Sequence, residues 1–209
     1  DRHAQIDGVV EEYHKGDADF HQMVADMAGI NRKQAKTVNL GIMYGMGRAK
    51  LAATLDITVE EAKSLLERYH DKVPFVKGLA DRVSVTAQKY GRIRTIMGRK
   101  CRFNMWEPRT FEYSKPITEK EMKESAFPQK YRRAFTYKAL NKLIQGSAAD
   151  QTKKAMADCF AEGLVPLMTV HDELCFSIES DAQAAKIKEI METGLKLKVP
   201  SKVDQELGN

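Results

Sequence analysis

The feature that most constrains the fold is a change in the spacing of apolar residues near residue 90. Upstream, apolar side chains recur every three or four positions behind helix-capping signals, of which Thr58 followed by Glu61 is the clearest. From Tyr90 to Arg99, polar and apolar residues alternate between glycines, which is the pattern of a strand or hairpin. Because the first part favours helices and the second a small sheet, we expect an α+β protein.

Other elements follow from the same kinds of signal. Helices are expected after the capping pair Asp19 and Gln22, over 32–44, over 131–160 and after the pair Ser180 and Gln183, with strands over 164–170 and 174–178. The segment 104–129 contains three prolines and is the least patterned part of the chain. Within it, residues 118–124 are expected to form a solvated helix face or a loop.

Length and cysteine usage exclude several classes of protein. The 209 residues allow one large domain or two small ones. Cys101, Cys159 and Cys175 are odd in number and far apart, which argues against a disulfide scaffold or zinc ribbon and for a reducing compartment. The longest apolar run, near 164–170, is far shorter than the ~20 residues that span a bilayer, and no signal-peptide pattern is present. We therefore expect a cytoplasmic protein with no membrane partner.

Two further features are weaker indications. The 34 basic and 29 acidic residues give a net charge of +5, which slightly favours an anionic partner. The chain begins at Asp1 rather than with methionine, so we expect an internal fragment of something longer.

Four side chains at four-residue intervals form the first candidate site. They are Arg32, Lys36, Leu40 and Tyr44. This spacing places them on one helix face, about one turn apart, with two cations at one end and an aromatic ring at the other. A nucleoside triphosphate has the same layout, because cations bind phosphate and a ring can stack on a base. On spacing alone, a surface helix with two basic residues and a buried Leu–Tyr edge explains the pattern better.

The second candidate is the sequence His171-Asp172-Glu173 between the two expected strands. We expect both acids at the tip of a strand-turn-strand unit, where adjacent carboxylates repel unless a cation lies between them. Mg²⁺ prefers one or two protein carboxylates together with substrate phosphates. The alternative is an ordinary polar hairpin turn.

The third candidate combines Asn141 and Gln145, one helical turn apart, with Gly146 and small residues after it. Amide side chains on a helix can donate to base edges in a minor groove. Taken alone, the pattern is explained better by a small-residue packing helix with two polar neighbours.

The order and spacing of these motifs resemble DNA polymerase family A. Residues 32–45 are similar to the fingers-helix motif, 90–99 to the return from fingers to palm, 141–150 to the minor-groove helix and 170–173 to the palm hairpin. The resemblance covers roughly residue 17 to the end. It implies an incomplete right-hand polymerase, with helical fingers over 1–130, including return strands near 90–104, and the C-terminal part of the palm, with a small antiparallel sheet, over 131–209.

The resemblance also implies roles for individual residues. Contacts to the incoming dNTP would come from His21, Arg32, Lys36, Leu40 and Tyr44. Contacts to DNA would come from Arg99, Asn141, Gln145 and His171. Catalysis would involve Asp172, Glu173 and Lys36, with Asp172 as a metal ligand.

The implied cofactor is Mg²⁺, as two ions shared with a further aspartate from the first palm motif, which we expect upstream of Asp1. No match for that motif is found in 1–31, where Asp7, Asp17, Asp19 and Asp26 have helical or capping contexts. The implied partners are primer-template DNA and dNTPs, with a processivity factor or an upstream polymerase half as further candidates.

Three departures from the family pattern are informative. Tyr137 stands where many relatives carry arginine, although Lys138 is adjacent. Leu40 replaces the usual Phe or Tyr at a position that resembles a sugar sensor, where a Tyr hydroxyl can stand in for a missing 3′-OH. Leu40 and the additional stretch 106–129 resemble bacteriophage-type members, so we expect a viral replicative enzyme in the host cytoplasm.

Other functions compete with this interpretation. A basic nucleic-acid-binding remnant without catalysis, or one half of a split polymerase, would explain the unmatched palm motif. A zinc hydrolase is disfavoured because it needs three spaced protein ligands. A single-subunit RNA polymerase shares the hand-like fold, but the VHDE and GSAAD segments favour a DNA polymerase.

Overall fold

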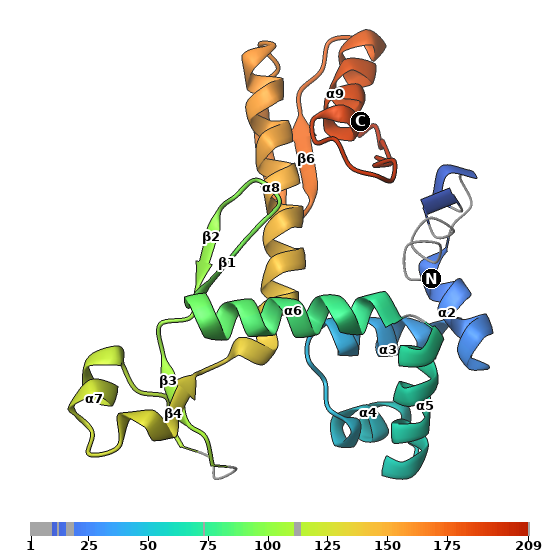
Figure 1. Cartoon of the computed structure of the whole chain (residues 1–209). Coiled ribbons are helices and arrows are strands. Elements are labelled where there is room, and N and C mark those ends of the chain that lie inside the picture. Colours follow the sequence, from blue (N-terminus) through green and yellow to red (C-terminus); the bar gives the residue numbers. More distant parts are fainter. Residues whose placement is uncertain (1–9, 12, 16–18, 73, 111–113, 209) are drawn as a thin grey trace. The chain divides into compact units, whose positions relative to one another are not determined.

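The computed structural model describes residues 10–11, 13–15, 19–72, 74–110 and 114–208, and it confirms the expected α+β class (Figure 1). The chain packs as two compact units. The first comprises residues 19–144, and the second comprises the chain from Gln145 onward together with described residues 10–15.

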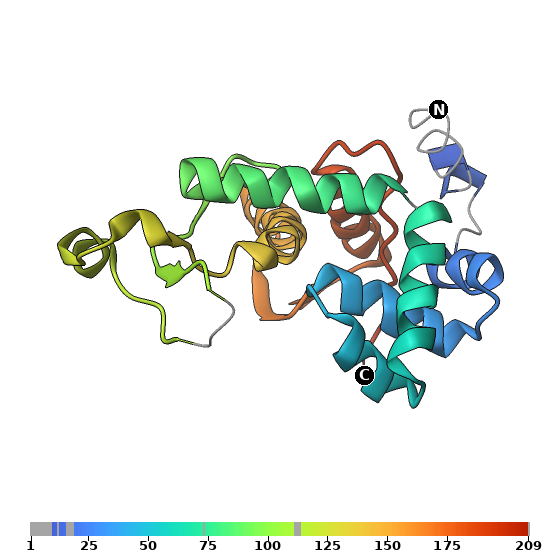
Figure 2. The same cartoon turned by 60° about the horizontal axis from the view of Figure 1, so that its bottom comes forward.

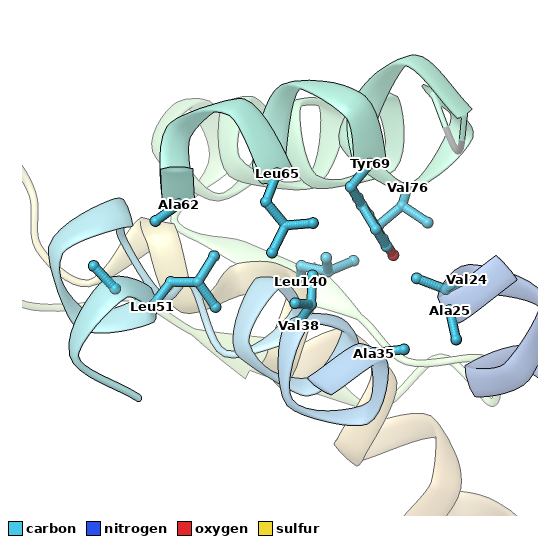
Figure 3. Close-up of a cluster of buried hydrophobic side chains, with 11 residues drawn as sticks. Val24, Ala25, Ala35, Val38, Leu51, Ala62, Leu65, Tyr69, Val76 and Leu140 are labelled. Carbon is cyan, nitrogen blue, oxygen red and sulfur yellow. The ribbon is translucent and has the colours of Figure 1, made fainter. Parts of the chain in front are cut away.

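The first unit opens with a group of helices. They are α2 (Phe20–Ala28), α3 (Arg32–Met43), α4 (Arg48–Leu55), α5 (Val59–Lys72) and α6 (Pro74–Tyr90). Their inner faces form one buried cluster, the first core, in which Val38, Leu51 and Tyr69 are almost inaccessible to solvent. Figure 3 shows Leu65 and Tyr69 of α5 reaching across this core, with Tyr69 directed toward Val24 of α2.

Local sequence signals explain where these helices begin. Asn31 and Gln34 form a reciprocal capping box at the start of α3. Thr58 and Glu61 form the same pair of hydrogen bonds before α5, which confirms the prediction. The backbone N–H and the hydroxyl of Thr58 both donate to the Glu61 carboxylate and hold its pKa below the ordinary value. Pro74 occupies the first position of α6, where its missing N–H costs nothing.

The expected hairpin after residue 90 is present. Strand β1 (Arg92–Arg94) pairs antiparallel with β2 (Lys100–Arg102). Ile93 at the centre of β1 is buried in a second core, which also contains Val83, Ala87, Phe103 and Ala139. This core joins the hairpin to α6.

Beyond the hairpin, residues 104–110 and 114–135 form an arm. Strand β3 (Trp106–Pro108) pairs with β4 (Tyr131–Arg133), and between them lie α7 (Glu119–Glu124) and the 3₁₀ turn η1 (Pro128–Lys130). A capping box between Thr118 and Glu121 begins α7, so the helical alternative for this segment is correct. Figure 2 shows the arm at the opposite end of α6 from α4 and α5.

Arg133 fastens the arm to the β1–β2 hairpin. Its guanidinium donates to the Phe103 carbonyl at 3.0 Å, and its Cζ lies 4.6 Å from the centre of the Trp106 ring. The same group covers Gly91, which has φ +64, and a Cβ at position 91 would lie 2.6 Å from Cζ of Arg133. The conformation at position 91 therefore favours glycine, and a larger residue would also displace the Arg133 guanidinium.

The expected helix over 131–160 is wrong at its start. Residues 131–133 form strand β4, the 3₁₀ turn η2 (Thr136–Lys138) follows, and α8 (Ala139–Ala161) begins only at Ala139. Two features override the helical pattern: the pairing of β4 with β3, and the positive φ of 62° at Phe135, which a right-handed helix excludes.

The second unit contains the later part of α8, strands β5 (Pro166–Val170) and β6 (Glu173–Phe176), and helix α9 (Asp181–Thr193). The two strands pair antiparallel, and Ser180 caps α9 as predicted. Cys159 packs with Ile187 and Ile190 in a third core.

The boundary between the units falls inside α8, after Ile144. The division into fingers up to residue 130 and palm from residue 131 stays a prediction. Within the described part of the chain, no helix is both long enough and apolar enough to cross a membrane.

Tyr69 provides a test of the first core. Its hydroxyl is buried and has no hydrogen-bond partner among the described residues. An unsatisfied buried polar group costs about 1–3 kcal/mol, so Tyr69→Phe should increase the free energy of unfolding by about 1 kcal/mol. Urea denaturation followed by circular dichroism at pH 8 measures this change.

The same substitution has a pH signature. Burial raises the pKa of Tyr69 to about 12 from an ordinary value of 10.0, so above pH 10 the unfolded state loses this proton more readily than the folded state, and stability falls as the pH rises toward 12. The wild type should lose more stability over this interval than Tyr69→Phe. The control Tyr90→Phe, at an exposed tyrosine, should follow the wild type. Equal losses in all three proteins would contradict this explanation.

Candidate nucleotide site and hairpin tip

One side of α3 presents the four side chains that the sequence singled out. This α3 face consists of Arg32, Lys36, Leu40 and Tyr44, all of which are exposed. The opposite side of the helix is fully buried at Ala35, Val38 and Asn39. The rise of a helix separates the cationic end of the face from its aromatic end by roughly 18 Å. The structure therefore favours the graded surface over the alternative in which Leu40 and Tyr44 form a buried edge.

The start of α2 is joined to the cationic end of this face. Asp19 caps α2 as predicted, and one carboxylate oxygen accepts the backbone N–H groups of His21 and Gln22 at 2.9 and 3.0 Å. Its other oxygen accepts from Nε of Arg32 at 2.6 Å. The hydrogen bond from Arg32, followed by that from Gln22, holds the pKa of the Asp19 carboxyl below its ordinary value. Arg32 is thus held beside the N-terminus of α2, which itself attracts anions.

His21 is connected to α3 by a second polar contact. Its Nδ1 lies 2.9 Å from Nδ2 of Asn39, whose side chain is fully buried. His21 itself is half-buried. The structure therefore brings His21 to the same helix that carries Arg32 and Lys36, as the predicted nucleotide site requires.

The aromatic end of the α3 face adjoins the turn before α8. Tyr44 is 53% exposed and ends α3, and Gly45 follows it with φ +70. A Cβ at Gly45 would lie 3.2 Å from Cδ2 of Tyr137, so a larger residue there would require the ring to shift slightly. Tyr137 is itself 56% exposed, and the ammonium of Lys138 lies 5.6 Å from the centre of its ring.

The hairpin tip lies in the second unit. Val170 pairs with Glu173, so the loop between β5 and β6 consists of His171 and Asp172 alone. His171 has φ +56, a left-handed conformation that tight hairpin loops require and that side chains other than glycine adopt at a cost. The expectation that both acids lie in the turn is wrong, because Glu173 is the first residue of β6.

The two carboxylates have different surroundings. Asp172 is exposed and makes no hydrogen bond or ion pair within the described residues. Glu173 Oε1 lies 3.6 Å from Cys175 Sγ, and partial burial together with this contact raises the pKa of the Cys175 thiol. No group of three or more His, Cys, Asp and Glu side chains in the described chain is placed to hold a metal ion. Asp172 and Glu173 can thus supply part of a site for an ion that also binds substrate oxygens, as Mg²⁺ does.

The predicted DNA contacts lie in three places: α8, the β1–β2 turn, and the β5–β6 loop that carries His171. Asn141 and Gln145 lie one turn apart on α8, with Asn141 half-buried and Gln145 exposed. Arg99 is exposed at the end of the β1–β2 turn, where its N–H donates to Thr95 Oγ1 at 3.1 Å. Of the acidic residues considered for the unmatched palm motif, Asp19 caps α2 and Asp26 lies within it, whereas Asp7 and Asp17 lie outside the described residues.

Sequence reasoning missed two members of this arrangement. Asp19 was predicted only as a helix cap and not as the partner of Arg32, because their contact joins two helices. Asn39 was not singled out, although it left a signal: it is a polar residue among Ala35 and Val38 on the apolar side of α3.

Comparisons with known proteins identify the family. The family model described as DNA polymerase family A matches residues 3–209. The chain belongs to this family. It is 36% identical over 91% of its length to a DNA-directed DNA polymerase of Pseudomonas phage M6, and 33% identical over 98% to DNA polymerase I of Geobacillus stearothermophilus.

A solved family A structure agrees. The POL domain of Pol1 from M. smegmatis, in complex with DNA primer-template and dNTP, is 30% identical and matches 92% of the chain with a TM-score of 0.71. The chain spans 30% and 23% of the two polymerases above and 34% of this solved chain. Family A membership and the right-hand polymerase fold of the matched region are therefore established, as the motifs predicted.

Proposed function

We propose that this chain is the nucleotide-binding and part of the catalytic region of a template-directed DNA polymerase. The reaction joins a primer 3′-OH to the α-phosphate of a dNTP and releases pyrophosphate. The observation that carries the proposal is the exposed α3 face, with two cations, an apolar residue and an aromatic ring in order along one helix. Family membership supports it, as does the primer-template DNA and dNTP bound to the related Pol1 domain.

We assign the triphosphate to the cationic end of the α3 face. Arg32 is fixed by Asp19 and offers its remaining N–H groups to phosphate oxygens, and Lys36 adds a charge one turn further along. His21 adds a third donor beside them. Leu40 then lies at the sugar and Tyr44 at the base and the templating position. These cations would stabilise the negative charge that develops as pyrophosphate leaves.

We assign metal binding to Asp172, with Glu173 on the side of the primer terminus. An exposed carboxylate with no partner in the described chain is chemically suited to Mg²⁺. In two-metal phosphoryl transfer, bound Mg²⁺ ions lower the pKa of the attacking hydroxyl and neutralise the leaving oxygens. A second protein carboxylate is needed for two ions, and we place it outside the described residues. His171, whose backbone is held at the turn, would orient the primer.

We assign the duplex to α8 and to Arg99. Asn141 and Gln145 would donate to base edges in the minor groove next to the new base pair. Primer-template DNA and dNTPs are the partners in this proposal. We place the protein in the cytoplasm, in keeping with its three scattered cysteines.

A nucleic-acid-binding remnant without catalysis is the second candidate. The observation that favours it is the absence of a third metal-binding side chain near Asp172 and Glu173 in the described chain. The two candidates differ in whether the α3 face acts on nucleotides, so kinetics with dNTP separate them.

Lys36 provides that test. In the polymerase that carries this sequence, Lys36→Ala should lower kcat/KM for dNTP about 10- to 100-fold, because a hydrogen bond to a charged group contributes about 1.5–3 kcal/mol. The affinity for primer-template should change much less. Steady-state primer extension and fluorescence anisotropy with labelled DNA measure the two quantities.

The control is Lys50→Ala. Lys50 is an exposed cation on α4, outside the α3 face. It should leave dNTP kinetics unchanged. Normal dNTP kinetics with weakened DNA binding in Lys36→Ala would move Lys36 to the duplex, and no primer extension by the wild type would favour the remnant.

Leu40 tests the placement of the sugar. Leucine has no hydroxyl to replace a missing 3′-OH, so the wild type should strongly reject dideoxynucleotides. Leu40→Tyr should relax this rejection about tenfold or more, equivalent to roughly 1–3 kcal/mol for one well-placed hydrogen bond, whereas Leu40→Phe should keep it. Competition between ddNTP and dNTP during primer extension measures the ratio.

Leu40 is 39% exposed, so neither substitution should overpack the core or lower the melting temperature. A Leu40→Tyr variant that melts early and rejects dideoxynucleotides as before would show that Leu40 is a packing residue.

A further inference from the structure

The β1–β2 hairpin concentrates positive charge on one side. Its register places Arg92 opposite Arg102 and Arg94 opposite Lys100. All four residues are exposed, whereas Ile93 between them is buried in the second core. Because alternate strand residues point to opposite sides, the four cations project from one surface, which we name the basic face.

Nothing in the described structure neutralises the basic face. Residues 91–106 contain no Asp or Glu. Arg94 donates to the Gly98 carbonyl at 2.9 Å, and no carboxylate of the described residues pairs with Arg92, Lys100 or Arg102. Like charges directly opposite one another destabilise a hairpin. The fold therefore retains a costly arrangement that an external polyanion would stabilise.

We infer that the basic face binds the phosphate backbone of the DNA duplex. This inference rests on the proposed function for the identity of the polyanion. The face consists of cations alone, so it can neutralise phosphates and displace their counterions but cannot read bases. Its three arginines can each bind a phosphate through two N–H groups. The hairpin would thus contribute affinity without sequence preference.

Charge removal tests the basic face. A triple variant, Arg92→Gln, Lys100→Gln and Arg102→Gln, should bind primer-template more weakly than the wild type at low salt. The slope of log affinity against log salt should become shallower by roughly 0.9 for each phosphate that is no longer neutralised, and so by about 2–3 in total. Anisotropy titrations of the full chain at several salt concentrations give both values.

The control removes the same charge elsewhere, as Lys63→Gln, Lys77→Gln and Lys120→Gln at exposed lysines. It should keep the slope of the wild type. The hairpin variant should also melt no lower than the wild type, because it relieves repulsion, and this excludes loss of the fold. If the hairpin variant binds as the control does, the inference is wrong while the proposed function stands. If the wild type does not bind DNA, both fail.

A separate observation concerns Asn39. Its side chain is fully buried, and its Oδ1 has no hydrogen-bond partner among the described residues. Its Nδ2 lies 2.9 Å from Nδ1 of His21. A buried amide oxygen without a hydrogen-bond partner costs stability. The fold keeps Asn39 at this position despite that cost, and His21 is the one hydrogen-bond partner of its side chain among the described residues.

We propose that Asn39 is a positioning residue that sets the tautomer of His21. An amide nitrogen can only donate, so Nδ1 of His21 must accept and the ring proton lies on Nε2. The Nε2–H of His21 is then available to an anionic oxygen. On the proposed function, that oxygen belongs to the triphosphate.

Nitrogen NMR of the full chain with labelled histidine tests the tautomer directly. Wild-type His21 should show a protonated Nε2 and an unprotonated Nδ1. Asn39→Asp places acceptor oxygens against the ring and should move the proton to Nδ1, with loss of the wild-type pattern. The control Asn141→Asp should leave His21 unchanged.

A wild-type spectrum with the proton on Nδ1 would overturn the proposal, whether or not Asn39→Asp folds. Because the tautomer is read without nucleotide, this result is independent of the proposed function.

Discussion

The packing of Ala35 and Val38 into the first core is the contact on which the candidate nucleotide site depends. It fixes the rotation of α3 about its axis, and that rotation alone decides which side chains face solvent. Because this side is buried, the residues of the α3 face, which are spaced four apart, form a continuous exposed surface. Packing in the hydrophobic core thus determines the orientation of charged side chains that are not themselves part of the core.

Burial sets the approximate arrangement of α2 and α3, and polar contacts between the two helices then fix it more closely. Asp19 joins the cap of one helix to a cation on the next, and Asn39 joins the inside of α3 to His21. Each contact links α2 to α3 by a group with a defined geometry, which apolar packing does not provide. The β1–β2 hairpin differs from α2 and α3 in how its charged side is held. Ile93 anchors the hairpin to the second core, and the cations of its basic face pair with no carboxylate of the described chain.

The sequence predicted most strongly what depends on local signals. The caps of α2, α5 and α9 and the hairpin of β1 and β2 followed from residues within a few positions of one another. Strand β4 was missed, because three residues carry too little pattern to compete with the helical period that follows them, and its partner β3 lies far away in the sequence. The α3 face was predictable from spacing alone. The contacts of Asp19 and Asn39 were not, since they depend on how two helices approach.

The covering of Gly91 by Arg133 also limits how this family member can diverge. The left-handed backbone at position 91 strains residues other than glycine, and a Cβ there would also displace the Arg133 guanidinium. A shorter residue at position 133 would open the space but would leave the Phe103 carbonyl without its donor and the Trp106 ring without its cation. One guanidinium thus closes the space above Gly91 and links the arm to the hairpin, so a change at either residue 91 or residue 133 alters the joint between these two segments.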